Sequence, residues 1–550
     1  MSPICSSESS HPLELSPISI IDDSPCPSAH DQRLQLPEPK LPIETACKKM
    51  IEKVPEELRA LAGSSLNILL HLQAAEYPRG LPLGSACSGS DLVTPALDLF
   101  FSTLVEQFSS SGYCSISAEP ADTKLGVDVK WACESDPHKQ RWLKECMLIS
   151  KVFVDIADIS HHEAPTSCST TASVDDVFLY SCGFCCQSVS KANPSAKNYI
   201  GCCESGKGKT GSTYQQSRSY IAQHLPVLVL LENVGGLSAQ DRLRVKEDLM
   251  ALGYKVIVLQ SNAIDHHLPS RRVRVWFLCC LDPDDCNLFP ASIAQERAVA
   301  MERGTRCTSQ EMEGLVDKYL VPEDDALFDI LKQMKQDDHP DKERVSKKIL
   351  KPKHELKWIQ KHKTFWKNMR RAGALRNRKG KPQFTQHGKL SKRETDIVRA
   401  ELIQHEKDYI PGQNVFIDVS QSIHRYPRSV GAAPTILPGG HICVVSRGLC
   451  DSPTADPVLR PLYGLEALRL QGLHESMLPN PGSIFSFRDS DLLGLAGNAF
   501  SFVHIHLAML CLLSGFSMPG SKREILERRE LANQKRSRRS LPRRRWKRLM

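Results

Sequence analysis

The stretch VFLYSCGFCCQS at residues 177–188 joins an apolar run, typical of a buried strand, to a loop that carries Cys186. The same construction recurs in PVLVLLENVGG at residues 226–236, where the loop delivers Glu232. In a third stretch, RRVRVWFLCC at residues 271–280, two Arg residues stand before the apolar run instead of after it. Together the three stretches predict an α/β fold in which a Cys, a Glu and two Arg meet at one edge of a parallel sheet.

In this order and near this spacing, the three stretches resemble the cytosine-5 DNA methyltransferase family, a branch of the S-adenosylmethionine-dependent methyltransferases. The resemblance implies a doubly wound, mainly parallel sheet of seven strands with a smaller, inserted target-recognition domain. It implies an enzyme that transfers a methyl group from S-adenosyl-L-methionine to carbon 5 of a cytosine flipped out of duplex DNA.

The resemblance assigns this chemistry to four side chains. Cys186 adds as a thiolate to carbon 6 of the cytosine, and a thiol with a pKa of roughly 8.5 must be activated for that step. Glu232 gives a proton or a strong hydrogen bond to ring nitrogen 3, and Arg272 and Arg274 orient the Glu or the ring carbonyl. Asn233 shapes the turn that presents Glu232. Taken singly, each has an ordinary alternative: a buried Cys as a small hydrophobe, a Glu as a cap, an Arg pair as a solvated face.

Two positions depart from the family pattern. Cys185 stands where the family has Pro before the nucleophile, which removes a fixed φ angle from the loop. Ser270 stands two positions before Arg272, where the family has Gln. These changes keep open a second hypothesis, a catalytically inactive relative that uses the same fold to bind nucleic acid.

The cofactor half resembles the family's first motif, Phe-x-Gly-x-Gly. The stretch LPLGSACSGSDLVTPALDLF at residues 81–100 has the pattern of a strand, a tight loop and a helix. Cys87 replaces the Phe, Gly89 keeps the first Gly, and Asp91 replaces the second. The resemblance therefore implies that Cys87, Ser88, Gly89 and Ser90 bind the cofactor.

Acidic residues follow the next two predicted strands. Glu134 ends VKWACESD at residues 129–136, where a carboxylate accepts hydrogen bonds from ribose hydroxyls. Asp155 lies in KVFVDIADI at residues 151–159 and is placed to hold the adenine amino group, with Asp158 as the alternative. The ordinary explanation for both is a helix cap or an exposed strand end.

The last family motif matches AGNAFSFVHIHLAMLCLLSGF at residues 496–516. Here Asn498 is expected to open an amphipathic helix that Gly515 closes, and Asn498 and Ala499 to complete the cofactor pocket. The apolar run is short for a membrane span, so we expect a core helix and no membrane association.

Two further stretches resemble family motifs. LRPLYGLEALRLQGL at residues 459–473 contains Glu466 and resembles a structural motif that holds the recognition region against the catalytic domain. AAPTIL at residues 432–437 is expected to bring Thr435 near the flipped base.

The segment at residues 199–219 allows other interpretations. Gly208, Lys209 and Thr210 resemble a phosphate-binding loop, but neither the required upstream Gly nor a preceding strand is present. Its Cys residues, with those near Cys186, have zinc-ligand spacing but no His nearby, so we expect no metal. The favoured prediction is a mobile loop that closes over the extruded base.

Composition divides the 550 residues into five parts. We expect a disordered Ser- and Pro-rich segment, a first catalytic part, a target-recognition region with a basic stretch at residues 332–399, a second catalytic part, and a basic tail. Their expected bounds are 1–60, 80–285, 286–455, 456–517 and 518–550.

The charge distribution and the Cys content indicate the cellular compartment and the binding partners. Residues 521–550 hold 13 Lys and Arg against three Glu, so this tail carries +10 of a chain whose net charge is +8. Such a tail suits nuclear import or non-specific phosphate binding, and a nuclear location is expected. Twenty Cys imply a reducing compartment. The expected partner is duplex DNA; RNA is less favoured, because the Cys-Phe-Thr signature of the related tRNA cytosine-5 methyltransferases is missing.

Overall fold

The computed structural model describes most of the chain from residue 41 onward. The described residues are 41–113, 125–282, 291–338, 352–371, 385–386, 390–405, 413–424, 426–446, 457–518 and 520–540.

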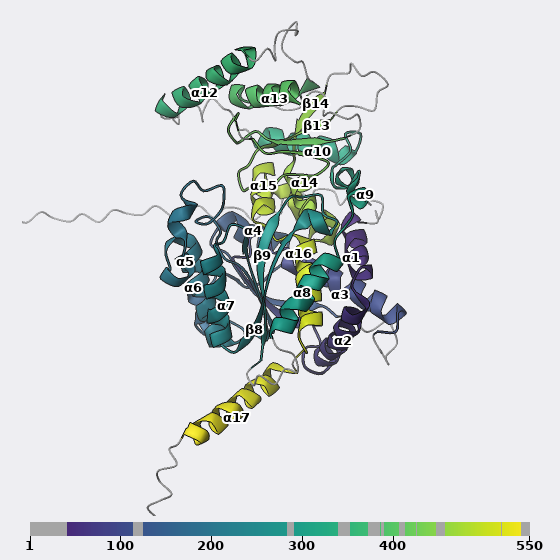
Figure 1. Cartoon of the computed structure of the whole chain (residues 1–550), viewed down its shortest axis with the longest axis vertical. Coiled ribbons are helices and arrows are strands. Elements are labelled where there is room, and N and C mark those ends of the chain that lie inside the picture. The colour runs from purple at the N-terminus through teal and green to yellow at the C-terminus, as the bar shows by residue number, and fades with distance from the viewer. Residues whose placement is uncertain are drawn as a thin grey trace, which may run out of the picture. The chain divides into compact units, whose positions relative to one another are not determined.

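A seven-stranded sheet forms the centre of the larger domain (Figure 1). Its strands, in spatial order, are β3 (Val152–Phe153), β2 (Val127–Cys133), β1 (Leu81–Ala86), β6 (Leu179–Gly183), β7 (Leu228–Val234), β9 (Val273–Leu281) and β8 (Tyr254–Asn262). Only β9 runs antiparallel to its neighbours, so the predicted doubly wound, mainly parallel sheet is confirmed. Strand order reverses between β1 and β6, where the carboxyl ends of open α/β sheets bind ligands.

Helices cover both faces of this sheet (Figure 1). One layer packs around α16 and comprises α1 (Pro42–Glu52), α2 (Glu56–Glu76), α3 (Val93–Ser110), α8 (Ala291–Gly304) and α16 (Phe502–Gly515). The other comprises α5 (Cys202–Ser205), α6 (Gly208–His224) and α7 (Ala239–Ala251). Between β2 and β3 runs α4 (Pro137–Glu145), and a hairpin of β4 (Glu163–Pro165) and β5 (Thr171–Ser173) follows β3.

The prediction of disorder over residues 1–60 is wrong for its last third. Pro42 begins α1, whose Ile43, Cys47 and Met50 recur at helical spacing and are buried. The Pro- and Glu-rich composition hid this short apolar stripe, which is stabilised by packing against α3 and α16 rather than by helix propensity. Residues 1–40 lie outside the described part of the chain.

The expected boundary at residue 285 was placed too early. α8 packs against β8 and α16, and the main hydrophobic core continues through Leu331 on α10 (Ala326–Asp337). Short helical turns at α9 (Ser309–Met312) and Leu315–Tyr319 connect the two. The apolar face of α8 packs against a strand that lies earlier in the chain. The amino-acid composition therefore does not change at the point where the larger domain ends.

A separate hydrophobic cluster forms the smaller domain. Its sheet has the order β10 (Thr385–Gln386), β14 (Val458–Pro461), β13 (Ile442–Ser446), β11 (Val415–Asp418) and β12 (Arg428–Val430). Two helices accompany it, α12 (Pro352–Arg371) and α13 (Lys392–Gln404). Phe365 of the basic stretch is buried in this cluster and Trp366 packs against it, so these two rings belong to the core of the smaller domain.

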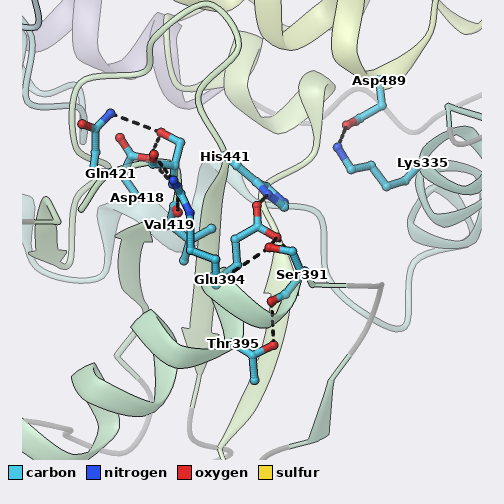
Figure 2. A network of polar contacts seen from close by, with 11 residues as sticks. Lys335, Ser391, Glu394, Thr395, Asp418, Val419, Gln421, His441 and Asp489 are labelled. Atoms are coloured by element: carbon cyan, nitrogen blue, oxygen red, sulfur yellow. Dashed lines mark hydrogen bonds and ion pairs between the residues drawn. The ribbon is translucent and has the colours of Figure 1, made fainter. Parts of the chain in front are cut away.

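Polar contacts fix α13 against the smaller sheet (Figure 2). Glu394 closes a capping box with Ser391 and accepts a contact from His441 Nδ1 at 2.8 Å. Nearby, Lys335 of α10 pairs with Asp489 at 2.7 Å. Asp489 begins α15 (Asp489–Asn498), which packs on α14 (Gly464–Arg469), so the ion pair ties three helices together.

The helix expected to open at Asn498 begins later. Asn498 ends α15, Ala499 leaves the helical conformation, and α16 starts at Phe502. Gly515 is the last residue of α16, as expected, but every residue of this helix is buried, so it is not amphipathic. The stretch Asp489–Gly515 is apolar and long enough to cross a membrane, yet 89% of its 18-residue apolar window is buried inside the protein, which agrees with a core helix.

Candidate active site

The Cys186 loop leaves the carboxyl end of β6 and is held by the first turns of α6. The backbone N–H of Cys185 donates to Thr213 Oγ1 at 3.0 Å, and the N–H of Ser188 donates to Thr210 Oγ1 at 3.3 Å. The Cys186 carbonyl accepts from Val189 and Ser190 in a tight turn. A Pro at position 185 could not donate the first of these bonds, so the hydrogen bond to Thr213 takes over the restraint that Pro supplies in the family.

Glu232 lies on the neighbouring strand, opposite Gly183 in the β6–β7 register. It is 7% exposed, and its Oε1 lies 2.5 Å from Nε of Arg274. A Cβ on Gly183 would stand 2.7 Å from the Phe500 ring, so only Gly allows this ring to pack beside the carboxylate. The predicted Glu232–Arg274 contact is therefore present in the structure.

Arg272 has a different partner from Arg274. Its side chain is buried, and Nη2 donates to the carbonyl of Gly497 in the last turn of α15 and to that of Ala499 just past its end. Nε and Nη1 have no hydrogen-bond partner within the described residues. A buried guanidinium with free N–H groups is a donor set for a planar ring carbonyl. Burial lowers the pKa of Arg272 to about 9, and the nearby Arg274 adds to this effect.

Asn233 joins the Glu232 strand to the nucleophile loop. Its Nδ2 donates to the Phe184 carbonyl at 2.8 Å, two residues before Cys186. Thr435 lies on a segment that pairs with the start of the Arg stretch, because Ala433 bridges Ser270 and Thr435 Oγ1 donates to the Arg271 carbonyl. Residues from four distant stretches thus converge on one edge of the sheet.

The electrostatics of this cluster suit proton donation by Glu232. Burial raises the pKa of Glu232, while Arg274 and Arg272 lower it, and the net direction is upward. Burial also raises the pKa of Cys186, with the Glu232 charge adding to it. The resting thiol is therefore protonated near neutral pH and must lose its proton when it attacks.

The predicted cofactor loop follows β1, and Glu134 closes it. The carboxylate is buried and accepts the Gly89 N–H at 2.9 Å through Oε2 and the Asp136 N–H at 3.0 Å through Oε1. Gly89 has a φ of +57°, and its Cα faces Asn498, whose Cβ and carbonyl oxygen lie 3.7 Å from where a Cβ would stand. Residues 409 positions apart in the chain therefore lie side by side, and their role in binding the cofactor stays a prediction.

Asp91, which replaces the family's second Gly, is accommodated in the same left-handed conformation, with φ +48°. Asp tolerates this region better than most residues with a side chain. Its Oδ2 accepts from Thr94 at 2.7 Å, while Oδ1, like Oγ of Ser90, is buried without a partner among the described residues. Burial raises the pKa of Asp91 to about 7.

The polar groups of this loop fit S-adenosyl-L-methionine. The site combines a carboxylate after β2, a Gly close to another backbone, and orphaned buried oxygens of Ser90 and Asp91. Cys87 lies at the loop's start with φ +50°. Asp155 is exposed and accepts the Ala157 N–H at 2.9 Å, and Asp158 begins the next turn. No contact within the described residues decides between these two carboxylates, so the adenine assignment stays a prediction.

The segment after the nucleophile is more helical than expected. Gly208 begins α6, which continues to His224, so a mobile loop over residues 199–219 is wrong for its second half. The phosphate-binding interpretation also loses its residues, since Thr210 is engaged with Ser188. Contacts of Thr210 and Thr213 with the Cys186 loop, rather than local propensity, explain why this polar, Gly-rich stretch is ordered.

Cys202, Cys203 and Asp241 place three possible metal-ligand atoms within 4.8 Å of one another. Asp241 already accepts the N–H groups of Gly201 and Cys203 and the Ser238 hydroxyl. These bonds make Asp241 a cap that holds the turn before α5. Cys182 and Cys186, which the zinc alternative included, lie on β6 and its loop instead.

Sequence patterns did not indicate the two Thr residues that hold the Cys186 loop. Thr210 and Thr213 are spaced to share one helix face, which is visible in the sequence, but their partners lie more than 20 residues earlier. The anchor of Arg272 on the Gly497 and Ala499 carbonyls was missed for the same reason, since backbone acceptors leave no residue pattern.

Residues 103–505 match the family of C-5 cytosine-specific DNA methylases. The chain belongs to this family. Among curated proteins it is similar to the DNA (cytosine-5-)-methyltransferase DMT5 of Cryptococcus neoformans var. grubii, with 21% identity over 497 residues. That match covers 86% of this chain but 19% of the relative, so the chain spans about a fifth of the relative's length.

Two solved structures are also similar to this family member. One is the S. pombe Dnmt2 methyltransferase, with 13% identity and a TM-score of 0.39, covering 79% of this chain and 98% of the other. The second is a putative DNA modification methyltransferase encoded within an E. coli prophage, with 13% identity, a TM-score of 0.34 and the same coverage.

Glu134→Ala should weaken S-adenosyl-L-methionine binding by about 1–3 kcal/mol, because a charge-assisted acceptor is lost and the Gly89 loop is released. Asn498→Ala should act in the same direction, since its side chain ends α15 beside Gly89. Titration calorimetry measures both, and Glu134→Gln, which keeps one acceptor, should lose less. Unchanged affinity in both variants, with unfolding temperatures preserved, would show that the cofactor site lies elsewhere.

Proposed function

We propose that this protein transfers a methyl group from S-adenosyl-L-methionine to carbon 5 of cytosine in duplex DNA through a covalent bond to Cys186. The observation that carries the proposal is the meeting of Cys186 with the Glu232–Arg274 ion pair and the free N–H groups of Arg272 at one sheet edge. Family membership supports the same reaction.

The proposed reaction gives each of these side chains one role. The Cys186 thiol loses its proton, and its sulfur forms a bond to carbon 6 as the carbon 5–carbon 6 double bond opens. Protonated Glu232 donates to nitrogen 3 and takes up the negative charge that would otherwise develop there, which its raised pKa favours. After carbon 5 has received the methyl group, it gives its proton to a water molecule and the double bond re-forms. The Cys186 sulfur leaves as the thiolate, and nitrogen 3 returns its proton to Glu232.

The cofactor, when bound, supplies an electrophilic methyl group on a sulfonium. The chain's own residues position it: Glu134 and Gly89 from the first half, and Asn498 and Ala499 from the second. Arg272 connects the two sites, because it lies beside Glu232 and Cys186 and also binds the Ala499 carbonyl. Cofactor binding and nucleophile placement are therefore mechanically linked through one buried guanidinium.

Duplex DNA is the proposed substrate, with the target cytosine rotated out of the stack at a cost of a few kcal/mol. A nuclear location follows from this substrate and from the basic tail. The tRNA alternative shares the chemistry but requires a different recognition surface. The inactive alternative rested on Cys185, Asp91 and Ser270. The structure accommodates the first two, through the Thr213 hydrogen bond and the left-handed loop conformation. Ser270 bridges Ala433, and its Oγ is buried without a partner among the described residues.

A trapping experiment tests the proposal. Duplex DNA with 5-fluorocytosine at the target should form a covalent adduct, since fluorine cannot leave from carbon 5 as a proton does. The adduct should require both the cofactor and Cys186, and a mispaired target should bind more tightly than a paired one. Fluorocytosine-substituted tRNA is the matched comparison. An adduct on tRNA alone would move the substrate to RNA, and normal cofactor binding with no adduct on either would establish the inactive alternative.

A further inference from the structure

Phe500 covers the row of residues that contains Glu232. Paired residues on neighbouring strands point to the same face of a sheet, and the register pairs Gly183 with Glu232 and Glu232 with Trp276. These three residues therefore form one row across β6, β7 and β9. The rings of Phe500 and Trp276 have centroids 5.3 Å apart, and the edge of the Phe500 ring lies over Gly183 at the other end of the row. The Phe500 ring thus spans the row, with Glu232 in its middle.

The space above Gly183 is shared by the Phe500 ring and one oxygen of the Glu232 carboxylate. From the point where a Cβ of Gly183 would stand, Cε1 and Cζ of Phe500 lie 2.7 and 3.0 Å away, and Oε2 of Glu232 lies 3.5 Å away. The other oxygen, Oε1, faces Arg274. The hydrogen bonds and ion pairs among the described residues do not engage Oε2, so this oxygen is left for the substrate.

The two Arg residues of β9 act against a proton on Glu232. Burial raises the pKa of Glu232 and outweighs Arg274 and Arg272, which lower it. The other titratable groups around the row are Cys182 and Cys186 from β6 and its loop and His504 from α16. Desolvation of this kind needs an apolar cover. Trp276 and Phe500 provide it, and only Phe500 is half-buried, so its ring forms the part of the cover that borders the open site.

We propose that Phe500 is a positioning residue whose ring keeps water away from Oε2 of Glu232 and so holds the proton that Glu232 gives to the cytosine. This inference rests on the proposed function, which assigns that proton transfer to Glu232. The ring itself neither donates nor accepts a proton. Without it, water would solvate the ionised carboxylate on the Oε2 side and favour loss of the proton.

The pH profile of methyl transfer tests this role. Only the protonated carboxyl donates, so activity falls as the pH rises through the pKa of Glu232. Phe500→Ala admits water and lowers that pKa, so its activity should begin to fall at a lower pH. On the alkaline side it should lie about tenfold below the wild-type activity, a part of the roughly 10²–10⁴-fold that general acid catalysis contributes. Phe500→Leu keeps an apolar side chain and should restore most of the activity. The proton loss of Cys186 favours higher pH in all three proteins.

The infrared band of the protonated Glu232 carboxyl gives a readout that needs no turnover, and its absence in Glu232→Gln assigns it. The titration midpoint of this band should lie at a lower pH in Phe500→Ala than in the wild-type protein. Glu232→Gln is also the kinetic control, because an amide N–H does not titrate, and adding Phe500→Ala to it should change activity by no more than about twofold. An unchanged midpoint, or an equal loss of activity in both backgrounds, would overturn the proposal.

Gly183→Ala moves the ring without removing it. The added Cβ would stand 2.7 Å from Cε1 of Phe500, so the ring must shift and the midpoint of the Glu232 band should fall. In the Phe500→Ala background the same Cβ has room and should have no further effect. Loss of cofactor affinity in Phe500→Ala, with the midpoint unchanged, would place the ring in the cofactor pocket and overturn the proposal. A midpoint that depends on the ring, in a wild-type protein without methyl transfer, would contradict only the proposed function.

Discussion

Replacing Cys186 by Ser should lower the rate of methyl transfer by roughly 10³-fold or more while leaving cofactor affinity within about twofold. A hydroxyl is a far weaker nucleophile than a thiolate, and the step that makes carbon 5 reactive depends on it. The hydrogen bond that closes the predicted cofactor loop runs between Glu134 and Gly89 and does not involve Cys186. Transfer of labelled methyl to duplex DNA and calorimetry with the cofactor measure the two quantities.

Cys185 provides the matched control. Cys185→Ser removes the adjacent thiol but keeps the backbone N–H that donates to Thr213, so the loop stays restrained and activity should change by no more than a few-fold. Cys185→Pro deletes that N–H and adds a fixed φ, and it reports whether the two restraints are interchangeable. An inactive Cys185→Ser beside an active Cys186→Ser would mean that the nucleophile is the first thiol of the pair.

The largest effect on stability is expected at Glu466. Its carboxylate is fully buried and accepts from Arg460 Nη1 at 2.8 Å and Nη2 at 2.9 Å, and from the backbone N–H of Val321 and of Tyr463. Glu466→Ala would remove the only buried carboxylate that pairs with Arg460 within the described residues and leave Glu323 at 4.0 Å as its nearest counter-charge. Breaking a buried pair in this way costs about 3–5 kcal/mol. Denaturant unfolding, followed by intrinsic fluorescence, measures the change.

This pair also joins the two domains. It lies beside β14, where Leu459 packs in the smaller core and Leu462, just after the strand, packs in the main core. Glu466→Ala should therefore weaken the packing between the smaller and the larger domain as well as lower the free energy of unfolding. Replacing both partners with Leu and Met should cost less than Glu466→Ala alone, because no charge is left unpaired. The exposed pair Arg523–Glu527 is the control, and Glu527→Ala should cause no measurable change. Equal losses of stability in Glu466→Ala and Glu527→Ala would show that burial does not set the energy of an ion pair in this protein.

The sequence alone determined those features that depend on local pattern. Apolar runs before Cys186 and Glu232 predicted β6 and β7, because a strand covered on both faces needs continuous hydrophobic residues. The Arg stretch predicted β9 in the same way. The meeting of Glu232 with Arg274 depends instead on β9 running antiparallel to β7, because this direction places the amino end of β9 beside the carboxyl end of β7. The order and spacing of the motifs along the chain were enough to indicate the family.

Tertiary structure alone decided how these parts are held. α1 is helical where composition indicated disorder, since its few apolar residues are stabilised by α3 and α16. Asn498 ends one helix rather than opening the next, because Gly497 and Ala499 turn their carbonyls toward Arg272. Thr213 restrains Cys185 across a gap of 28 residues. Each of these contacts joins a side chain to a backbone group or core surface far away in the chain, and such partners impose no periodicity, spacing or composition on the sequence between them.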